Sequence, residues 1–269
     1  NYHFSPMKDH LDLSQMNRRD FVKTTGLGLG TLAVPSFLSS QNKSAGTPAE
    51  KLKIAIIGVA GKGRGATLEC VSENVVALCD VNKEQVDATK KGDVSFKEAI
   101  DHHESNGAVW FKDYRVMLKD MSDQIDAIII SIPDHMHFPV ALSAINLGIH
   151  VYCEKPLTHT IDEARVLAAA AKKKGVRTQM GNQGHSLAGT CLVREWIQSG
   201  ILGNVREVHS WTDRPAVYWK QGMGRPDHSK LMPVTPQGFD WELWLGVAKK
   251  RAYDPAYAHE LAVVIQDGM

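Results

Sequence analysis

A glycine-rich turn followed by an acidic residue is the first pattern in this sequence that could do chemistry. Gly58, Ala60 and Gly63 occupy the three small-residue positions of a G-x-G-x-x-G turn, and Gly61 stands beside the alanine. In such a turn the first position makes the tight bend, the second lets backbone approach a pyrophosphate, and the third lets a helix pack on a strand. Asp80 follows about twenty residues later, where a carboxylate can hold the hydroxyls of an adenosine ribose. The pattern predicts a dinucleotide-binding site.

The charge of Asp80 discriminates between the two nicotinamide cofactors. A carboxylate in this position repels the additional phosphate of NADP, because like charges held together in a site cost on the order of several kcal/mol. No arginine follows Asp80 immediately. We therefore expect NAD rather than NADP. The alternative for Asp80 is an ordinary strand-end acid or helix cap.

The turn and the acid each require a preceding strand, and the sequence supplies both. Short β-rich apolar runs occupy 52–57 and 75–79. A helix is expected over 66–72, another begins at Lys83, and the remaining strands and helices are expected at 108–111, 114–119, 125–130, 150–153, 161–174 and 177–180. This alternation predicts a parallel sheet in an α/β fold, a Rossmann dinucleotide-binding domain over residues 51–185.

Polar loops follow three of these strands at their carboxyl ends, which is the edge where open α/β sheets bind ligands. The loops cover 131–137, 154–156 and 181–185. Their members that could contact a cofactor or a substrate are Ser131, Pro133, His137, Glu154, Lys155, Asn182, Gln183 and His185.

The glycine turn, the Pro-Asp-His-x-His loop and the triplet Glu154-Lys155-Pro156 together resemble the Gfo/Idh/MocA oxidoreductases, the family of glucose-fructose oxidoreductase and inositol dehydrogenase. The resemblance covers roughly residues 51–255. It implies that Lys155 reaches the substrate hydroxyl and the nicotinamide edge, and that Glu154 lies near the nicotinamide ribose. Pro156 would fix the backbone turn, and a cis bond would suit it. The implied activity is NAD-dependent oxidation of a sugar, polyol or sugar derivative.

Such a place for Lys155 is chemically reasonable. When a hydride leaves a carbinol carbon the hydroxyl proton must also leave, and an ammonium beside that oxygen stabilises the alkoxide or, once deprotonated, accepts the proton. The alternative is a solvated lysine before a proline turn. We assign Lys155 and His185 to catalysis, and Ser131, Pro133 and His137 to cofactor binding. His137 could instead satisfy backbone groups at the start of the next helix, and His185 could have a purely structural role.

The first 46 residues resemble an export leader. Arg18 and Arg19 precede an uncharged, Gly- and Leu-rich stretch at 24–38, as in a twin-arginine signal. The stretch is too short to span a bilayer comfortably, so no stable membrane insertion is expected. The alternative is a short amphipathic or buried helix, for which the repeated glycines and Pro35 are poor material. We expect a periplasmic protein with tightly bound NAD, because free NAD should be scarce outside the cytoplasm.

Residues 186–269 are expected to form part of a second, α+β domain that binds substrate and supports oligomerisation. After a helix at 192–199, the alternating residues 203–211 would form the first strand of this domain, and the resemblance implies that its sheet is open and antiparallel. In the resembled family this domain continues and adds an Asp-x-x-x-His pair, whereas this sequence ends at Met269. We therefore expect an incomplete domain with doubtful activity of its own, and a homo-oligomer for the full-length family member.

Composition excludes several other classes of function. The formal charge is +1, with no basic face for nucleic acid. The four cysteines form no CxxC pair, so no metal site is predicted, and most should be small buried residues. Two alternatives to a sugar dehydrogenase remain: a glycoside hydrolase that oxidises its substrate transiently with bound NAD, and an inactive nucleotide-binding fragment.

Overall fold

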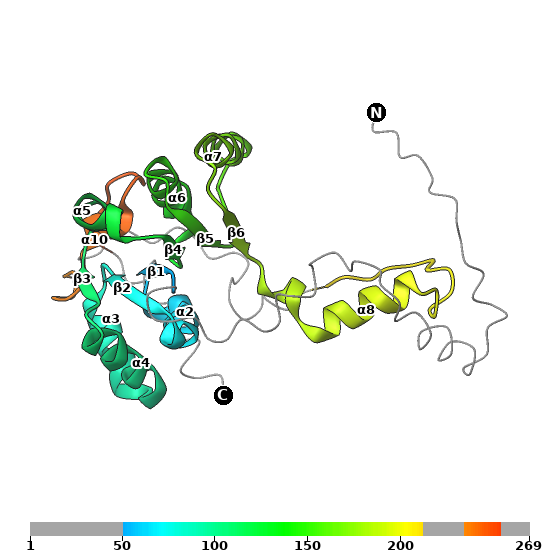
Figure 1. Cartoon of the computed structure of the whole chain (residues 1–269), viewed down its shortest axis with the longest axis horizontal. Helices are drawn as coiled ribbons and strands as arrows, with labels where there is room; N and C mark the ends of the chain where they lie inside the picture. Colours follow the sequence, from blue (N-terminus) through cyan, green and yellow to red (C-terminus); the bar gives the residue numbers. More distant parts are fainter. Residues whose placement is uncertain (1–50, 212–233, 254–269) are drawn as a thin grey trace, which may run out of the picture. The chain divides into compact units, whose positions relative to one another are not determined.

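The computed structural model describes residues 51–211 and 234–253. Its centre is a six-stranded sheet in the order β3-β2-β1-β4-β5-β6, and all the strand pairs are parallel (Figure 1). The strands are β1 (Lys53–Ile57), β2 (Asn74–Cys79), β3 (Val109–Phe111), β4 (Ala127–Ile130), β5 (His150–Glu154) and β6 (Thr178–Gly181). The strand order reverses between β1 and β4, so a ligand crevice is expected at their carboxyl ends. The predicted Rossmann-like α/β class is confirmed.

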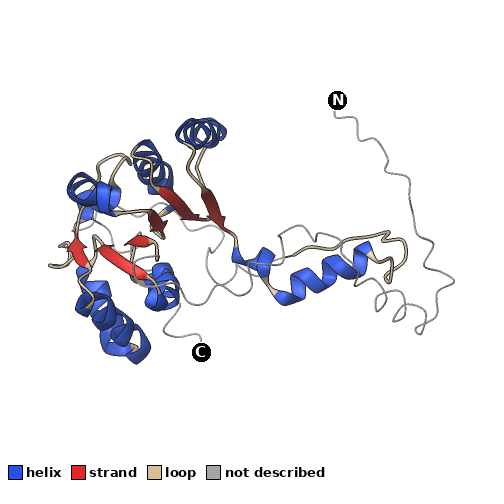
Figure 2. Ribbon diagram, in the orientation of Figure 1, coloured by secondary structure: helices blue, strands red, loops and turns tan. Residues whose placement is uncertain are grey.

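Helices cover both faces of the sheet, as Figure 2 shows. One layer contributes Met117, Val140 and Leu167 to a core with β1 and β4, and the other contributes Val86 and Phe96 to a second core. The first layer consists of α5 (Tyr114–Met121), α6 (His137–Asn146) and α7 (Ile161–Lys174), and the second of α2 (Arg64–Glu69), α3 (Lys83–Gly92) and α4 (Val94–Ser105). Short 3-10 turns η4 (Gly61–Gly63), η5 (Cys70–Ser72), η6 (Ser122–Gln124), η7 (Asp134–Met136) and η8 (Gln183–Ser186) complete this part.

Local capping explains where α7 begins and ends. The Thr160 hydroxyl accepts a hydrogen bond from the Glu163 N–H, and the Glu163 carboxylate accepts one from the Thr160 N–H, which is a capping box. Gly175 follows the last turn with a φ of +69°. Only glycine adopts this conformation readily, so the helix stops there.

Three of the four cysteines are buried in the core, as expected. Burial raises the pKa of Cys70 to about 11 and that of Cys153 to about 12, and it raises the pKa of Cys79 further. These thiols therefore stay neutral and behave as small apolar groups. Cys191 is exposed. Within the described ranges no group of His, Cys, Asp and Glu side chains could hold a metal ion, and no helix is long and apolar enough to cross a membrane.

Two predicted elements differ from the structure. The helical segment from Lys83 is two helices, because Asp93 ends α3 and its carboxylate caps α4 through the Phe96 N–H. The strand predicted at 203–211 was wrong: the segment has no regular secondary structure and is exposed throughout. A strand needs a neighbour for its backbone hydrogen bonds, and the described residues pair none with it. The helix predicted at 192–199 is α8 (Ala188–Gln198). The expected leader lies outside the described residues.

A segment that the sequence places in the second domain packs against the Rossmann domain. The Asp240 N–H donates to the Val81 carbonyl, and the Lys83 N–H donates to the Gly238 carbonyl. The imidazole of His135, in η7, lies 2.9 Å from the Trp244 carbonyl oxygen. The segment contains α10 (Trp241–Leu245) and an aromatic cluster of Phe239, Trp241, Trp244 and Tyr253. It therefore braces the loops that follow β2 and β4.

Candidate functional site

The glycine turn leaves no room for side chains at its first and third positions. Gly58 has a φ of +77°, and a Cβ there would lie 2.1 Å from the Ser131 carbonyl oxygen. A Cβ on Gly63 would lie 1.7 Å from the Gly58 carbonyl oxygen. The turn is thus pressed against the end of β4 on one side and against its own first residue on the other. This close packing fits the dinucleotide-binding turn predicted from the sequence.

Asp80 ties this turn to the end of β2. Its carboxylate accepts hydrogen bonds from the Val59 N–H at 2.8 Å, the Ala60 N–H at 3.4 Å and the Asn82 N–H at 2.9 Å. Burial raises the pKa of Asp80, and the three N–H donors oppose that effect. A carboxylate has about four acceptor positions, so one remains for a ribose hydroxyl. Asp80 therefore lies beside the glycine turn, and its contact with a ribose stays a prediction.

Glu154, at the end of β5, is buried and only partly satisfied. Its Oε1 accepts a hydrogen bond from the Gln183 side chain and lies 3.6 Å from the Lys62 ammonium. Its Oε2 is buried without a hydrogen-bond partner. A Cβ on Gly181 would approach the Glu154 carboxyl to 2.8 Å, so this glycine makes room for it. The orphaned oxygen is an acceptor that a ligand hydroxyl could satisfy.

His137 has no ring nitrogen left for a cofactor. Its Nδ1 lies 2.5 Å from the Pro156 carbonyl oxygen, and its Nε2 lies 2.8 Å from the Ile132 carbonyl oxygen. The ring is 1% exposed. The structure therefore favours the backbone-satisfying role over the predicted cofactor contact. His137 joins the loop after β4 to the turn after β5.

Lys155 and His185 lie at the carboxyl ends of the neighbouring strands β5 and β6. Both are exposed, and the Lys155-Pro156 bond is cis, as the resemblance suggested. The Gln183 amide, predicted to meet a sugar, donates to Tyr152 and Glu154 instead. Ser131 and Pro133 are half-buried in the loop after β4. Six of the predicted positions thus stand along one edge of the sheet: Gly58, Asp80, Ser131, Glu154, Lys155 and His185.

Sequence reasoning missed Lys62. It lies inside the glycine turn, where its only recognisable feature was its charge, and its partner Glu154 is distant in sequence. The contact arises because the sheet brings the ends of β1, β4 and β5 to one edge. No local sequence pattern predicts such an ion pair.

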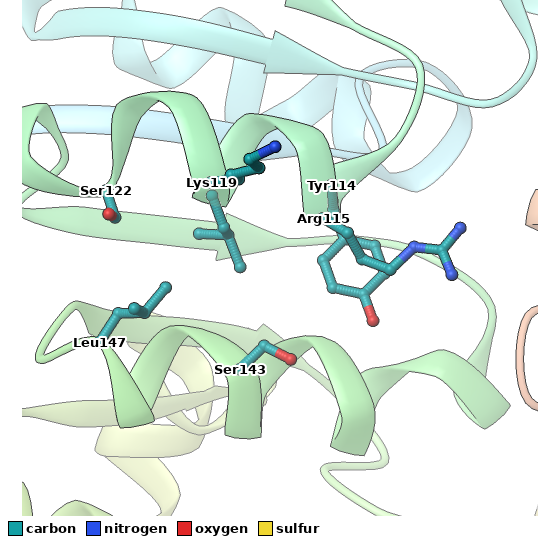
Figure 3. Close-up of a pocket in the computed structure, with 7 residues that line it drawn as sticks. Tyr114, Arg115, Lys119, Ser122, Ser143 and Leu147 are labelled. Carbon is teal, nitrogen blue, oxygen red and sulfur yellow. The ribbon is translucent and has the colours of Figure 1, made fainter.

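A separate open hollow lies between α5 and α6 (Figure 3). It is lined by Tyr114, Arg115, Leu118, Lys119, Ser122, Ser143 and Leu147. None of the predicted site residues lines it, so it is distinct from the candidate site at the carboxyl edge of the sheet.

Comparison with known proteins shows which family this part of the chain is similar to. Residues 52–182 match the Gfo/Idh/MocA family, described as an oxidoreductase family with an NAD-binding Rossmann fold. A D-glucoside 3-dehydrogenase of Escherichia coli is 30% identical over 168 residues, which is 61% of this chain and 43% of the relative. A glycosyl hydrolase family 109 protein of Shewanella pealeana is 25% identical over 261 residues, 82% of this chain and 55% of the relative.

Solved structures show a similar partial match. A myo-inositol 2-dehydrogenase of Lactobacillus plantarum is 24% identical, with a TM-score of 0.46, over 58% of this chain and 42% of that one. The chain spans less than two thirds of the curated relatives it matches; for example, it covers 29% of an uncharacterized oxidoreductase of Streptococcus pneumoniae.

Proposed function

We propose that this chain, whose residues 52–182 match the Gfo/Idh/MocA family of NAD-binding oxidoreductases, binds NAD and serves in hydride transfer between that cofactor and a sugar, polyol or sugar derivative. The observation that carries the proposal is the glycine turn, whose first and third positions exclude a Cβ and whose N–H groups are fixed by Asp80. The substrate class is supported by relatives named D-glucoside 3-dehydrogenase and levoglucosan dehydrogenase.

The residues present fit the cofactor. The glycine turn would receive the pyrophosphate, and Asp80 would accept from the adenosine ribose with its remaining acceptor position. The buried Oε2 of Glu154 lacks a partner, so it would accept from the nicotinamide ribose. When bound, NAD supplies the hydride acceptor.

Lys155 would act on the substrate hydroxyl. It is exposed at the end of β5, directly after Glu154, so its ammonium can reach a ligand at this edge. There the ammonium would stabilise negative charge on the oxygen, and the neutral amine would take the hydroxyl proton at Nζ. His185, at the end of the adjacent strand, would contact a second hydroxyl of the same substrate.

Affinity for the two reduced cofactors tests the first half of this proposal. The fluorescence of NADH and of NADPH should be titrated with the chain of residues 1–269. We expect one NADH site, and weaker binding of NADPH, because the carboxylate of Asp80 repels the additional phosphate. Asp80→Asn should narrow the difference between the cofactors. Tighter binding of NADPH by the wild type would contradict the assignment.

Sugar turnover tests the second half and separates it from a second candidate. The glycosyl hydrolase family 109 relative aligns with 82% of this chain, which favours a hydrolase that oxidises its substrate only transiently. A dehydrogenase produces NADH in proportion to the sugar oxidised. A hydrolase of this kind releases sugar from a glycoside without net NADH. A chain that binds NADH but turns over neither kind of substrate would be an inactive nucleotide-binding part.

Export and assembly belong to the same proposal. The Arg18-Arg19 pair and the uncharged stretch after it support a twin-arginine route to the periplasm, with NAD held tightly and recycled. Fusion of the first 46 residues to a reporter should export it, and Arg18→Lys with Arg19→Lys should keep it inside. Homo-oligomerisation through the second domain is expected of the full-length family member.

A further inference from the structure

Lys62 and Glu154 form an ion pair at the carboxyl edge of the sheet, where a dinucleotide would bind. Lys62 stands in the glycine turn after β1, and Glu154 is the last residue of β5. Strand β4 lies between these two strands, and the sheet reverses its order between β1 and β4. The 3.6 Å contact between Nζ and Oε1 therefore passes over the place where a dinucleotide would enter.

The two partners differ in how firmly they are held. The Lys62 side chain is 60% exposed, whereas that of Glu154 is 7% exposed. Glu154 is also bonded to Gln183. The Lys62 ammonium is largely in solvent and no hydrogen bond joins it to Glu154, so Lys62 is free to turn to another anion. The Glu154 side chain is fixed, because it is buried and hydrogen-bonded to Gln183.

The neighbouring cation in the turn is not available for the crevice. Arg64 is bonded to Asp93, the residue that separates α3 from α4. Lys62 is thus the cation of this turn that points towards the carboxyl ends of β4 and β5.

We propose that Lys62 binds the pyrophosphate of the dinucleotide. In the free chain the ion pair with Glu154 keeps the Lys62 ammonium beside the site, and on binding the phosphates replace the Glu154 carboxylate as its partner. This inference rests on the proposed function, because it assumes that NAD binds in the crevice. Entry of the pyrophosphate would bring negative charge between the partners. Lys62 would turn to the phosphates, and Glu154 would be released to accept from a ribose hydroxyl.

Binding of ADP and of adenosine to the chain of residues 1–269 tests the role of Lys62. ADP has the two phosphates but lacks the nicotinamide ribose. Adenosine lacks both the phosphates and the nicotinamide ribose. Lys62→Gln should weaken binding of ADP and NADH about two- to fivefold at low salt, the range for one exposed charge pair. It should leave adenosine binding unchanged, and Lys62→Arg should bind ADP like the wild type. The matched control is Lys97→Gln, which replaces a lysine of similar exposure that is paired with Asp101 on α4. This variant should bind ADP and NADH as tightly as the wild type.

A second variant tests the exchange itself. Glu154→Gln removes the competing carboxylate, so it should tighten ADP binding, and this gain should vanish in the double variant with Lys62→Gln. Circular dichroism and thermal unfolding establish that each variant is folded. If Lys62→Gln binds ADP like the wild type, or if Glu154→Gln has the same effect without Lys62, the inference is overturned while the proposed function stands. A folded wild type that binds neither NADH nor ADP overturns both.

Discussion

Gly63 has the least room for a side chain among the described glycines, and this predicts a sharp difference from its neighbour Gly65. A Cβ at Gly63 would meet the Gly58 carbonyl oxygen at 1.7 Å, and backbone cannot rotate away. Gly63→Ala should therefore lower the free energy of unfolding by about 1–3 kcal/mol and weaken NADH binding. Urea denaturation and NADH titration measure the two effects.

Gly65→Ala is the matched control for that substitution. No atom lies within 4 Å of a Cβ at Gly65, which stands in α2. Alanine in a helix is favoured over glycine by about 1 kcal/mol, so this variant should be neutral or slightly more stable. Equal destabilisation by the two substitutions would contradict the account of the turn.

At the residue scale, the sequence located the groups but not their partners. The turn glycines and Asp80 were recognisable because their spacing reflects a local strand-turn-helix geometry, and the Glu154-Lys155-Pro156 triplet was recognisable through the family resemblance. The ion pair of Lys62 was not predictable, since it depends on which strands become neighbours. The role of His137 stayed open in the sequence because only the fold shows two carbonyl oxygens facing its ring.

At the scale of elements, the start of α5 depends on Asp113 in a way that pH should reveal. Its carboxylate accepts from the Arg115 N–H at 2.9 Å, and the Arg115 guanidinium lowers the pKa of Asp113. A carboxyl group with a lowered pKa in the folded state stabilises the protein above its unfolded pKa, and this contribution is lost as pH falls through the folded value. Asp113→Ala should therefore cost about 1 kcal/mol at pH 7.

The difference in the free energy of unfolding between Asp113→Ala and the wild type should shrink as pH falls below about 4, where carboxylates become protonated. Chemical denaturation at a series of pH values measures it. Asp120→Ala, at an exposed position of the same helix, is the control and should show no comparable trend. If the free energy of unfolding of Asp113→Ala stays below that of the wild type by a constant amount down to pH 3, the proposed contribution of the cap is ruled out.

Elements with their own start and stop signals were predicted best. The helix at 161–174 has a capping box and a terminal glycine, and the structure gives it the same ends. The helix from Lys83 was not divided, because Asp93 as a cap has no strong signal beside it. The prediction of a strand at 203–211 was wrong because alternating apolar residues show only that a strand formed there would have one apolar and one polar face. Its formation requires a partner strand.

At the scale of the whole molecule, apolar side chains are concentrated on α8 and the segment after it. The exposed members are Leu192, Val193, Trp196, Ile197, Ile201, Leu202, Val205, Val208 and Trp211. Apolar patches of this kind mark surfaces that associate with other protein. The chain should therefore self-associate with increasing concentration, which sedimentation velocity measures.

Substitution of Trp196 and Ile197 by lysine should reduce this association. Because both side chains are exposed, the free energy of unfolding should change by no more than about 0.5 kcal/mol. Val94→Lys, at an exposed position of α4, is the control and should leave association unchanged. A large loss of stability in the double variant would show that this face is buried in solution.

We propose that this chain binds NAD at the carboxyl ends of β1 and β4, and native mass spectrometry of the chain of residues 1–269 tests this proposal most directly. The method separates folded from unfolded chains by their charge states and weighs any bound molecule. We predict one dinucleotide per folded chain, either retained from the cell or taken up when NADH is added, and its loss in Gly63→Ala. A folded wild-type chain that carries no nucleotide in the presence of excess NADH would contradict the claim.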